Sequence, residues 1–214
     1  MHTAVIVFAK APVPGLAKTR LAPALGAEGA AALAARMLRH ALAQAAAAAL
    51  GPVELCAAPD TTHPALHEAA AACGATLGAQ GEGDLGERMH RAFTRHLAQH
   101  GAALLMGTDA PALDATRLRQ AARALQQHDA VFVPALDGGY ALVGLRRADA
   151  RVFAGMRWSH AQVMEHTRQR LREAGLRWAE LPAVADVDEP ADLVHLPAGW
   201  MDSLRAGTPA GRAA

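Results

Sequence analysis

Asp109 is the residue of this chain that is best placed for chemistry. It directly follows an apolar run in the stretch ALLMGTDAP, residues 103–111, and such a run predicts a buried strand or the end of a buried helix. In open α/β sheets, ligands collect at the carboxyl ends of the strands, so a carboxylate there can hold a metal ion or a substrate. The alternative is that Asp109 caps the next helix. Asp114 is better placed for that role, because apolar residues recur at helical spacing after it.

A basic loop, KAPVPGLAKTRLAP, follows the first apolar run of the chain. It brings Lys10, Lys18 and Arg20 close together in sequence, and its prolines restrict the backbone. A strand followed by a rigid basic loop and a helix is typical of phosphate binding, because backbone amides and cations converge on one point. The loop has neither the Walker A nor the dinucleotide-binding glycine spacing. A solvated basic turn is the alternative.

A glycine-rich stretch, QGEGDLGERM, precedes another helical pattern. Its glycines, Gly83 and Gly86 among them, let the backbone approach a planar ligand such as a nucleobase. Asp84 belongs either to that site or to a helix cap, since a glutamate stands three residues after it. Arg88 is either a nucleotide contact or a cation on the helix surface.

Paired glycines in DGGY, Gly138 and Gly139, form an ordinary turn between strands or leave room for a ligand. Asp137 opens this stretch and adds a carboxylate to it. Tyr140 either packs against a sugar or belongs to the core. Trp158 presents the same choice, with packing favoured.

An acidic cluster lies near the end of the chain, in VADVDEPADL. Asp188 precedes Glu189 and Pro190 and is a natural helix start. Several carboxylates together also suit a hard cation, since Mg²⁺ or Mn²⁺ takes oxygen ligands and needs only one or two of them from the protein. Asp186 and Asp188 are therefore candidate ligands, with Asp109 as their partner.

The elements that position these residues follow from the hydrophobic pattern. Short apolar runs followed by a loop residue or a proline predict strands at residues 4–8, 53–57, 102–106 and 130–134. Helical patterns are found at residues 29–50, 63–73, 85–99 and 116–127. Such alternation predicts an α/β fold in which parallel strands are joined by crossover helices.

The alternation breaks after Val133. The stretch DGGYALVGL predicts a turn into another strand with no helix between, and therefore an antiparallel element in the second half of the sheet. A helix at 161–174 and a strand at 177–181 follow. Ser159 and Gln162 have the spacing of a capping box for that helix.

The composition favours one domain. A chain of 214 residues, 52% of them hydrophobic, is long enough to bury a substantial core, so we expect one domain at residues 1–200 and a tail at 201–214. A formal charge of +1 offers no broad electrostatic surface for nucleic acid. Histidine pairs at i, i+4 lack the glutamate of a zinc HExxH motif, and exposed helix faces are favoured for them.

The cysteine content and the N-terminus indicate a cytoplasmic protein. Cys56 and Cys73 are too few for a disulfide framework and suit a reducing compartment. The N-terminus lacks the pattern of a secretory signal. The longest alanine-rich run, residues 41–50, is shorter than the roughly 20 residues of a membrane-spanning helix. The oligomeric state is left open.

Five motifs occur in a fixed order: FAKAPVPGLAKTRL, QGEGDLGERM, GTDAP, VPALDGGYALVGL and DVDEPADL. As an ordered set they resemble a bacterial family of GT-A-type glycosyltransferases, long catalogued as a domain of unknown function. The resemblance runs from the first strand to Leu193. That family is similar to the nucleotide-diphospho-sugar transferase superfamily, including the guanylyltransferases of molybdenum cofactor and 2-phospho-lactate. It implies a Rossmann-like sheet that binds a nucleotide in its first half and the second substrate in its second half.

The resemblance also implies roles for single residues. Lys18 and Arg20 are expected at the phosphates, and the loop that begins at Gln80 is expected near the base. Gly138 and Gly139 are expected to border the sugar or the acceptor.

Metal binding is implied for Asp109 together with Asp188, with Mg²⁺ or Mn²⁺ as the ion. The usual glycosyltransferase DxD is absent, because Pro111 stands two residues after Asp109. The metal site is therefore expected to use one acid here and a distant one.

A second departure concerns nucleotidyl transfer. Sugar nucleotidyltransferases commonly carry a Gly-x-Gly-x-Arg loop followed by a Pro-Lys pair, whereas here Gly15 stands alone and Pro23 is followed by Ala24. The missing lysine weakens that interpretation, since its charge stabilises the attacked phosphate.

The expected function is transfer of a sugar from a nucleotide-diphosphate donor to a small-molecule acceptor. Asp137 is the candidate base if transfer inverts the anomeric centre. The first alternative is nucleotidyl transfer from a nucleoside triphosphate with release of pyrophosphate. The second is a non-catalytic protein that binds nucleotide sugars. The base, the sugar and the acceptor are left open.

Overall fold

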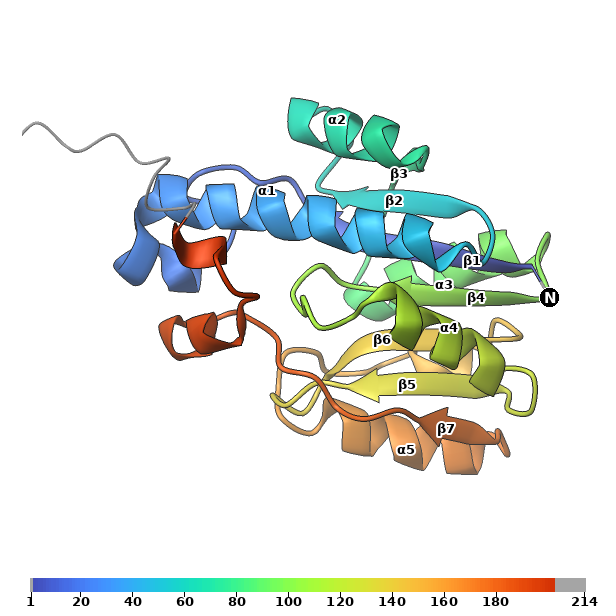
Figure 1. The fold of residues 1–214 in the computed structure, drawn as a ribbon. Helices are drawn as coiled ribbons and strands as arrows, with labels where there is room; N and C mark the ends of the chain where they lie inside the picture. Colours follow the sequence, from blue (N-terminus) through green and yellow to red (C-terminus); the bar gives the residue numbers. More distant parts are fainter. Residues whose placement is uncertain (1, 203–214) are drawn as a thin grey trace, which may run out of the picture.

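The computed structural model describes residues 2–202, which form a seven-stranded sheet with helices on both faces (Figure 1). The order across the sheet is β3-β2-β1-β4-β6-β5-β7. Only β6 runs against its neighbours β4 and β5; the other pairings are parallel. The strands are β1 (Thr3–Lys10), β2 (Val53–Ala58), β3 (Thr76–Ala79), β4 (Ala102–Met106), β5 (Ala130–Pro134), β6 (Tyr140–Leu145) and β7 (Trp178–Glu180). The expected fold class, including its antiparallel element, is confirmed.

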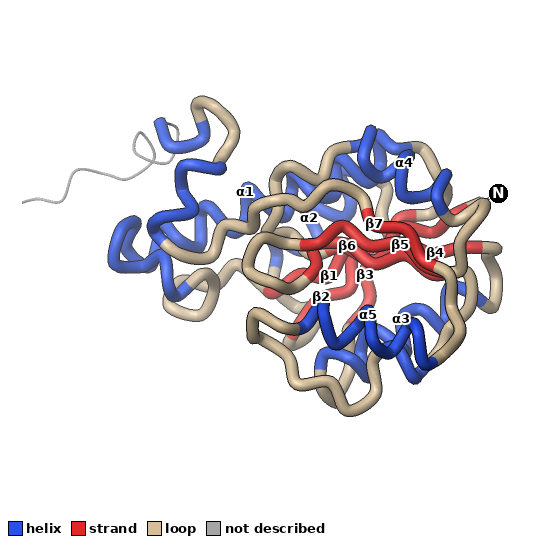
Figure 2. The backbone as a smooth tube through the Cα atoms, turned by 90° about the horizontal axis from the view of Figure 1, so that it is seen from below, coloured by secondary structure: helices blue, strands red, loops and turns tan. Residues whose placement is uncertain are grey.

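The two faces of the sheet are covered by different helices. Figure 2 shows α1, α2 and α4 on one face and α3 and α5 on the other. The helices are α1 (Ala22–Ala48), α2 (Pro64–Cys73), α3 (Leu85–Leu97), α4 (Ala115–Ala124) and α5 (Val163–Glu173). Short 3₁₀ turns are η1 (Thr19–Leu21), η2 (Ala150–Val152) and η3 (Pro190–His195).

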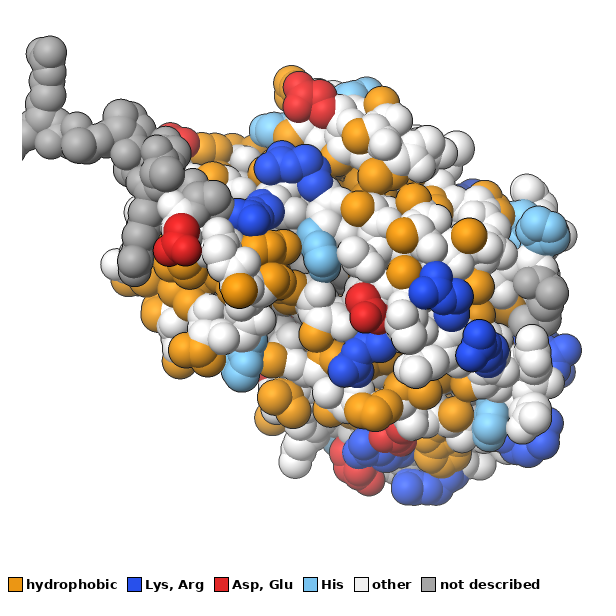
Figure 3. Space-filling model, in the orientation of Figure 1, with side chains coloured by type: hydrophobic (Ala, Val, Ile, Leu, Met, Phe, Trp, Pro, Cys, Tyr) orange, Lys and Arg blue, Asp and Glu red, His pale blue; other side chains and the backbone are white. Residues whose placement is uncertain are grey.

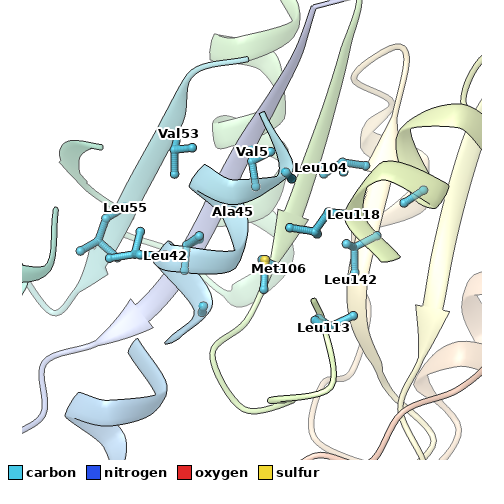
Figure 4. Close-up of a cluster of buried hydrophobic side chains, with 14 of the residues drawn as sticks. Val5, Leu42, Ala45, Val53, Leu55, Leu104, Met106, Leu113, Leu118 and Leu142 are labelled. Atoms are coloured by element: carbon cyan, nitrogen blue, oxygen red, sulfur yellow. The ribbon is translucent and has the colours of Figure 1, made fainter. Parts of the chain in front are cut away.

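Strand β1 shows why both faces need helices. Side chains alternate between the faces of a strand, and here Val5 and Val7 pack with α1 while Ile6 and Phe8 pack with α3. Figure 4 shows the first of these cores, in which Leu42 of α1 and Leu118 of α4 lie against the strands. Because both cores are apolar, chemistry is confined to the edges of the sheet.

Strand register brings the predicted loops together. Strand β1 pairs in parallel with β2 and with β4, and Val7 lies opposite Met106. The basic loop therefore leaves the sheet beside the loop that carries Asp109. The pairing of Met106 with Leu142 adds the start of antiparallel β6 to the same edge.

Several local expectations differ from the structure. Strand β3 was not predicted, because it is short and its side chains are half-buried or exposed. Helix α1 begins before the expected range, at Ala22, and its backbone breaks at Gly26, where φ is 71°.

The capping box expected at Ser159 and Gln162 is wrong. Ser159 has a left-handed φ of 64° outside the helix, and Gln162 is the N-cap without a side-chain bond. His160 Nδ1 instead accepts a hydrogen bond from the Gln162 backbone.

Two other helix caps are present, the one at Asp84 deciding between the two roles left open for that residue and the one at Asp114 confirming the prediction. Asp84 and Glu87 make a reciprocal capping box at the start of α3, and the Asp114 side chain accepts from Arg117 N at the start of α4. The expected tail lies outside the described residues except for Met201 and Asp202.

The surface agrees with the low net charge. On the face seen in Figure 3, acidic and basic side chains are interspersed rather than gathered into one patch. No helix within residues 2–202 is both long and apolar enough to cross a membrane.

Candidate functional site

A cleft of about 720 Å³ opens at the edge of the sheet where the loops after β1, β4 and β5 meet. Its walls contain most of the residues singled out from the sequence. They are Lys10, Lys18, Arg20, Gln80, Arg88, Asp109, Asp137, Gly139, Tyr140, Trp158, Asp186 and Asp188. Four candidates, Gly83, Asp84, Gly86 and Gly138, are not among the lining residues.

Lys18 is at the centre of the polar part of the cleft. Its Nζ lies 2.5 Å from Asp109 Oδ1 and 2.7 Å from Asp188 Oδ1, and it donates to Val187 O at 2.7 Å. Only 8% of the side chain is exposed. Burial alone would lower the pKa of Lys18, but the two carboxylates outweigh it and the pKa is raised. The ammonium is therefore charged and fully partnered inside the protein.

Backbone contacts hold this arrangement from two sides. Lys18 has a left-handed backbone, with φ at 49°, which turns its side chain away from the regular path of η1. Val187 N donates to Asp109 O at 2.9 Å, while Val187 O accepts from Lys18. One residue of the C-terminal segment thus fixes both partners of the ion pair.

The carboxylates of Asp109 and Asp188 are the type of ligand that a divalent metal ion such as Mg²⁺ takes. Oxygens of Asp109 and Asp188 converge on a single point, and that point holds a cation, the Lys18 ammonium. Mg²⁺ commonly takes one or two carboxylates and completes its shell with water and phosphate. Two carboxylates are therefore enough protein ligands for such an ion, and in this structure the Lys18 ammonium occupies the point where they meet. Among residues 2–202 no group of three or more His, Cys, Asp or Glu side chains that could hold a metal occurs.

A further carboxyl, Asp186, lies beside this pair. Burial raises its pKa, and the nearby charges of Asp137 and Asp188 raise it further. Asp137 itself is exposed at the turn before β6, where its Oδ1 accepts from Gly139 N at 2.8 Å. The cleft thus carries Asp137 and Asp186 in addition to the two acids that meet at Lys18.

The loop before α3 is organised mainly by its own polar contacts. Gln80 is buried and its Nε2 donates to Ala9 O and Cys56 O, tying the loop to the ends of β1 and β2. Arg88 Nε donates to Gly83 O at 2.8 Å. Arg91 donates to Gln80 O and to Glu82 O, each at 2.8 Å. Gln80 and Arg88 therefore shape the wall of the cleft as well as lining it.

Two aromatic side chains form the opposite wall. Tyr140 and Trp158 meet edge to face, with ring centroids 6.4 Å apart. Tyr140 Oη and Trp158 Nε1 are buried and have no hydrogen-bond partner among the described residues. Burial raises the pKa of the Tyr140 hydroxyl, so that it stays protonated and able to donate. Leu85, Met89 and Val163 add apolar surface to the same cleft.

Gly138 has a packing role. With φ at 91°, it lies so close to the next loop that a Cβ would be 2.0 Å from Ala161 O. Its carbonyl accepts from Met164 N at 2.8 Å. It therefore locks the turn that carries Asp137 to the start of α5, and only Gly139 of the pair lines the cleft.

Three contributors were missed from the sequence. Val187 acts through its backbone, which no side-chain pattern reveals. His160 lines the cleft but stood in a segment taken for a helix cap. Arg91 lies three residues after Arg88, and that helical spacing was the signal that could have found it.

The sheet order with its reversed β6, together with a polar cleft at this edge, defines a protein of the nucleotide-diphospho-sugar transferase superfamily. Residues 41–160 match the bacterial family described as "Uncharacterized protein conserved in bacteria (DUF2064)". The chain belongs to this family.

Solved structures agree with this assignment. The chain is similar to a protein from Desulfovibrio desulfuricans G20 that has been proposed to be a nucleotide-diphospho-sugar transferase, with 32% identity and a TM-score of 0.82 over 90% of this chain and 84% of that one. No curated protein matches the chain.

More distant structures share the fold alone. A cytidylyltransferase from Leptospira borgpetersenii has 13% identity and a TM-score of 0.60 over 90% of this chain and 84% of that one. Glucosyl-3-phosphoglycerate synthase from Mycobacterium tuberculosis, solved with Mn²⁺, uridine diphosphate and glucosyl-3-phosphoglycerate, has 10% identity and a TM-score of 0.51 over 90% of this chain and 75% of that one.

Proposed function

We propose that the chain transfers a sugar from a nucleotide-diphosphate donor to a small hydroxyl-bearing acceptor. The observation that carries this proposal is the convergence of Asp109, Asp188 and a cationic loop in one cleft of about 720 Å³. Such a cleft has the size of a small-molecule site. The fold is shared with a glucosyl transferase solved with Mn²⁺ and uridine diphosphate, which supports a nucleotide-sugar donor.

The phosphates are assigned to the basic loop. Lys10 and Arg20 are exposed cations of the cleft, and Arg20 makes a long contact of 3.7 Å to Glu189. They can therefore turn to a ligand at little cost. Asp109 and Asp188 would hold a divalent ion, which would supply Lewis-acid charge to the leaving diphosphate.

In the transfer itself, the bond between the anomeric carbon and the phosphate oxygen breaks, and its electron pair leaves with the nucleoside diphosphate. The acceptor oxygen forms the new bond to the anomeric carbon. In an inverting reaction Asp137 takes the proton of that oxygen, since it is an exposed carboxylate that lines the cleft.

The sugar or the acceptor is assigned to the aromatic wall. Tyr140 Oη and Trp158 Nε1 have no hydrogen-bond acceptor within residues 2–202, and an unpaired buried donor is costly. A small shift of the Trp158 loop, which has no regular structure, would bring both donors to a ligand hydroxyl. The apolar ring faces would pack against the C–H face of a sugar.

Nucleotidyl transfer with release of pyrophosphate is the second candidate. The cytidylyltransferase is the better structural match of the two distant enzymes, with a TM-score of 0.60 against 0.51. The absence of a lysine after Pro23 counts against it.

One experiment separates these activities. The full-length protein is incubated with Mg²⁺ or Mn²⁺ and panels of nucleoside triphosphates and nucleotide sugars, with and without sugar and polyol acceptors. Slow release of nucleoside diphosphate and free sugar, accelerated by an acceptor, is the expected result. Pyrophosphate release would replace the first proposal by the second. Binding without turnover across the acceptor panel would indicate a non-catalytic binding protein.

Replacement of Asp109 by Asn tests the metal assignment. We expect Asp109→Asn to abolish metal-dependent nucleotide binding while the protein stays folded. The reason is that one of the two carboxylates that converge on the proposed metal position is lost. The measurement is the thermal shift produced by nucleotide with Mn²⁺. Asp114→Asn is the matched control, since it makes the same change at a helix cap, where Asn caps as well as Asp. A nucleotide shift that survives Asp109→Asn contradicts the assignment.

A further inference from the structure

The chain uses lysine almost nowhere. Of its 21 basic Lys and Arg residues, the sequence contains lysine only at positions 10 and 18, and arginine at the rest. Both lysines line the cleft. Both lysines of the chain therefore lie at the cleft, where an ammonium group has a geometry that a guanidinium group lacks.

The contacts of Lys18 use the geometry of an ammonium group. Its Nζ has three N–H groups and is surrounded by three oxygens, from Asp109, Asp188 and the Val187 backbone, at 2.5 to 2.7 Å. An ammonium is a compact point charge with three rotatable donors, whereas a guanidinium is a planar fork. A compact, singly placed cation ringed by oxygens is the arrangement that a small metal ion also adopts.

The same contacts conflict with a role for Lys18 as a phosphate ligand in this conformation. All three of its donors are already used, and only 8% of its side chain is exposed. Asp109 and Asp188 are more open, at 49% and 41% exposed. The carboxylates are therefore the more accessible members of this cluster, and the ammonium is largely shielded from solvent.

We propose that Lys18 is an exchangeable internal counter-ion of Asp109 and Asp188. It holds the two carboxylates together while no divalent ion is present and leaves them when they bind one, which frees its ammonium for the phosphates of the ligand. The proposal rests on the metal assignment of the proposed function and adds an order of events to it. Lys18 must move before it contacts phosphate.

Removal of Lys18 tests the exchange through binding alone. Because the ammonium competes for the same oxygens, Lys18→Met is expected to bind Mn²⁺ more tightly than the wild type in the absence of nucleotide. Hydrogen bonds to charged groups are strong enough that the gain should be at least about tenfold. Calorimetry or Mn²⁺ electron paramagnetic resonance measures it. Lys10→Met is the matched control, because it removes the same charge from the same cleft without removing a partner of the carboxylates.

Amine labelling tests the exchange in the unaltered protein. Only two lysines are present, so reductive methylation followed by mass spectrometry reads Lys18 directly and uses Lys10 as an internal reference. Lys18 is expected to react much more slowly than Lys10 without metal. Saturating Mn²⁺ alone should accelerate the modification of Lys18 by at least about tenfold and leave that of Lys10 nearly unchanged. This labelling experiment uses the wild-type protein, so its result does not depend on whether a variant folds.

The outcomes separate this inference from the proposed function. If Lys18 stays protected with Mn²⁺ bound, or if Lys18→Met and the wild type bind Mn²⁺ equally, the exchange is wrong and the metal site stands. If neither protein binds Mn²⁺, the metal assignment fails and the exchange fails with it. Tighter binding by Lys18→Met together with metal-dependent labelling of Lys18 supports the exchange.

Discussion

At the scale of single residues, the aromatic wall of the cleft stores an unfavourable contribution to stability. Tyr140 Oη and Trp158 Nε1 are buried without partners among residues 2–202. A buried donor that has lost water and gained no acceptor costs about 1 to 3 kcal/mol. Residues kept at such a cost are candidates for ligand contact rather than for packing alone.

Removal of the tyrosine hydroxyl should therefore not destabilise the protein. We expect Tyr140→Phe to leave the melting temperature unchanged or to raise it, because the ring still packs on Phe132 and an unpaired polar atom is lost. The measurement is thermal unfolding without ligand. A clear fall in melting temperature would mean that the hydroxyl has an acceptor in the folded protein.

Trp178 provides the matched control for indole donors. Its Nε1 donates to Glu180 Oε1 at 3.0 Å, away from the cleft. Trp178→Phe should lower stability slightly and leave nucleotide-sugar binding unchanged. Trp158→Phe should leave stability unchanged or raise it slightly, and should weaken nucleotide-sugar binding.

At the scale of elements, a buried charge cluster fastens α3 to β2. Glu54 of β2 accepts two hydrogen bonds from Arg95, at 2.8 and 2.7 Å, and contacts His96 of the same helix. Burial acts to raise the pKa of Glu54, but the bonds from His96 and Arg95 lower it to about 2. Burial also raises the pKa of the neighbouring Cys56 thiol to about 12, which favours the neutral thiol, and the side chain packs in the core.

The stability that Glu54 contributes should depend on pH in a fixed direction. Its pKa falls from 4.5 to about 2 on folding, so the contribution is complete above pH 4.5 and is lost as the pH falls towards 2. The shift corresponds to a contribution on the order of 3 kcal/mol. Urea unfolding should show Glu54→Gln as clearly less stable than the wild type at pH 7, and the difference should shrink at pH 3.

Glu68 of α2 offers a matched control, because it is exposed. Glu68→Gln should leave the free energy of unfolding nearly unchanged at both pH values. An equal loss of unfolding free energy in Glu54→Gln and Glu68→Gln would mean that the loss comes from the change in net charge and not from the Glu54 cluster.

At the scale of the whole molecule, the C-terminal segment closes the site over the first helix. Trp200 packs into a small core with Leu21, Leu33 and Met37, and its ring meets His40 at 5.2 Å between centroids. Val187 belongs to the same core. The core therefore joins the basic loop to the segment that carries Asp188.

Loss of this anchor should damage stability and binding together. Trp200→Ala removes a large buried ring, and such changes cost about 3 kcal/mol or more. We also expect faster hydrogen exchange at residues 184–196 and weaker nucleotide binding. Val194→Ala is the control, because Val194 is 79% exposed in the same segment. Normal exchange at these residues in Trp200→Ala would contradict a positioning role for the anchor.

The sequence predicted the sheet better than the site. Buried runs such as Ala102–Met106 and Ala130–Pro134 appear as strands with those bounds, because continuous apolar segments have few alternatives. The edge strand Thr76–Ala79 was missed because no buried face marks it.

Most of the residues that line the cleft were singled out from the sequence, but the ion pairs that Lys18 makes with two of them were not. Asp109 and Asp188 were expected beside each other, and the structure brings both to one cation. That this cation is Lys18 depends on a left-handed backbone at that residue and on the Val187 carbonyl. Neither the backbone conformation of Lys18 nor the position of the Val187 carbonyl can be read from the types of the side chains.

The separation of Lys18 and Asp188 along the chain has a consequence for synthesis. They are 170 residues apart, so a ribosome adding 5 to 20 residues each second needs roughly ten to thirty seconds between them. The first four strands and the basic loop leave the ribosome while Lys18 still lacks Asp188 and the Val187 carbonyl. The cleft is thus among the last parts to be completed, because Asp109 and Asp188 cannot meet at Lys18 before the final segment of the chain has folded back.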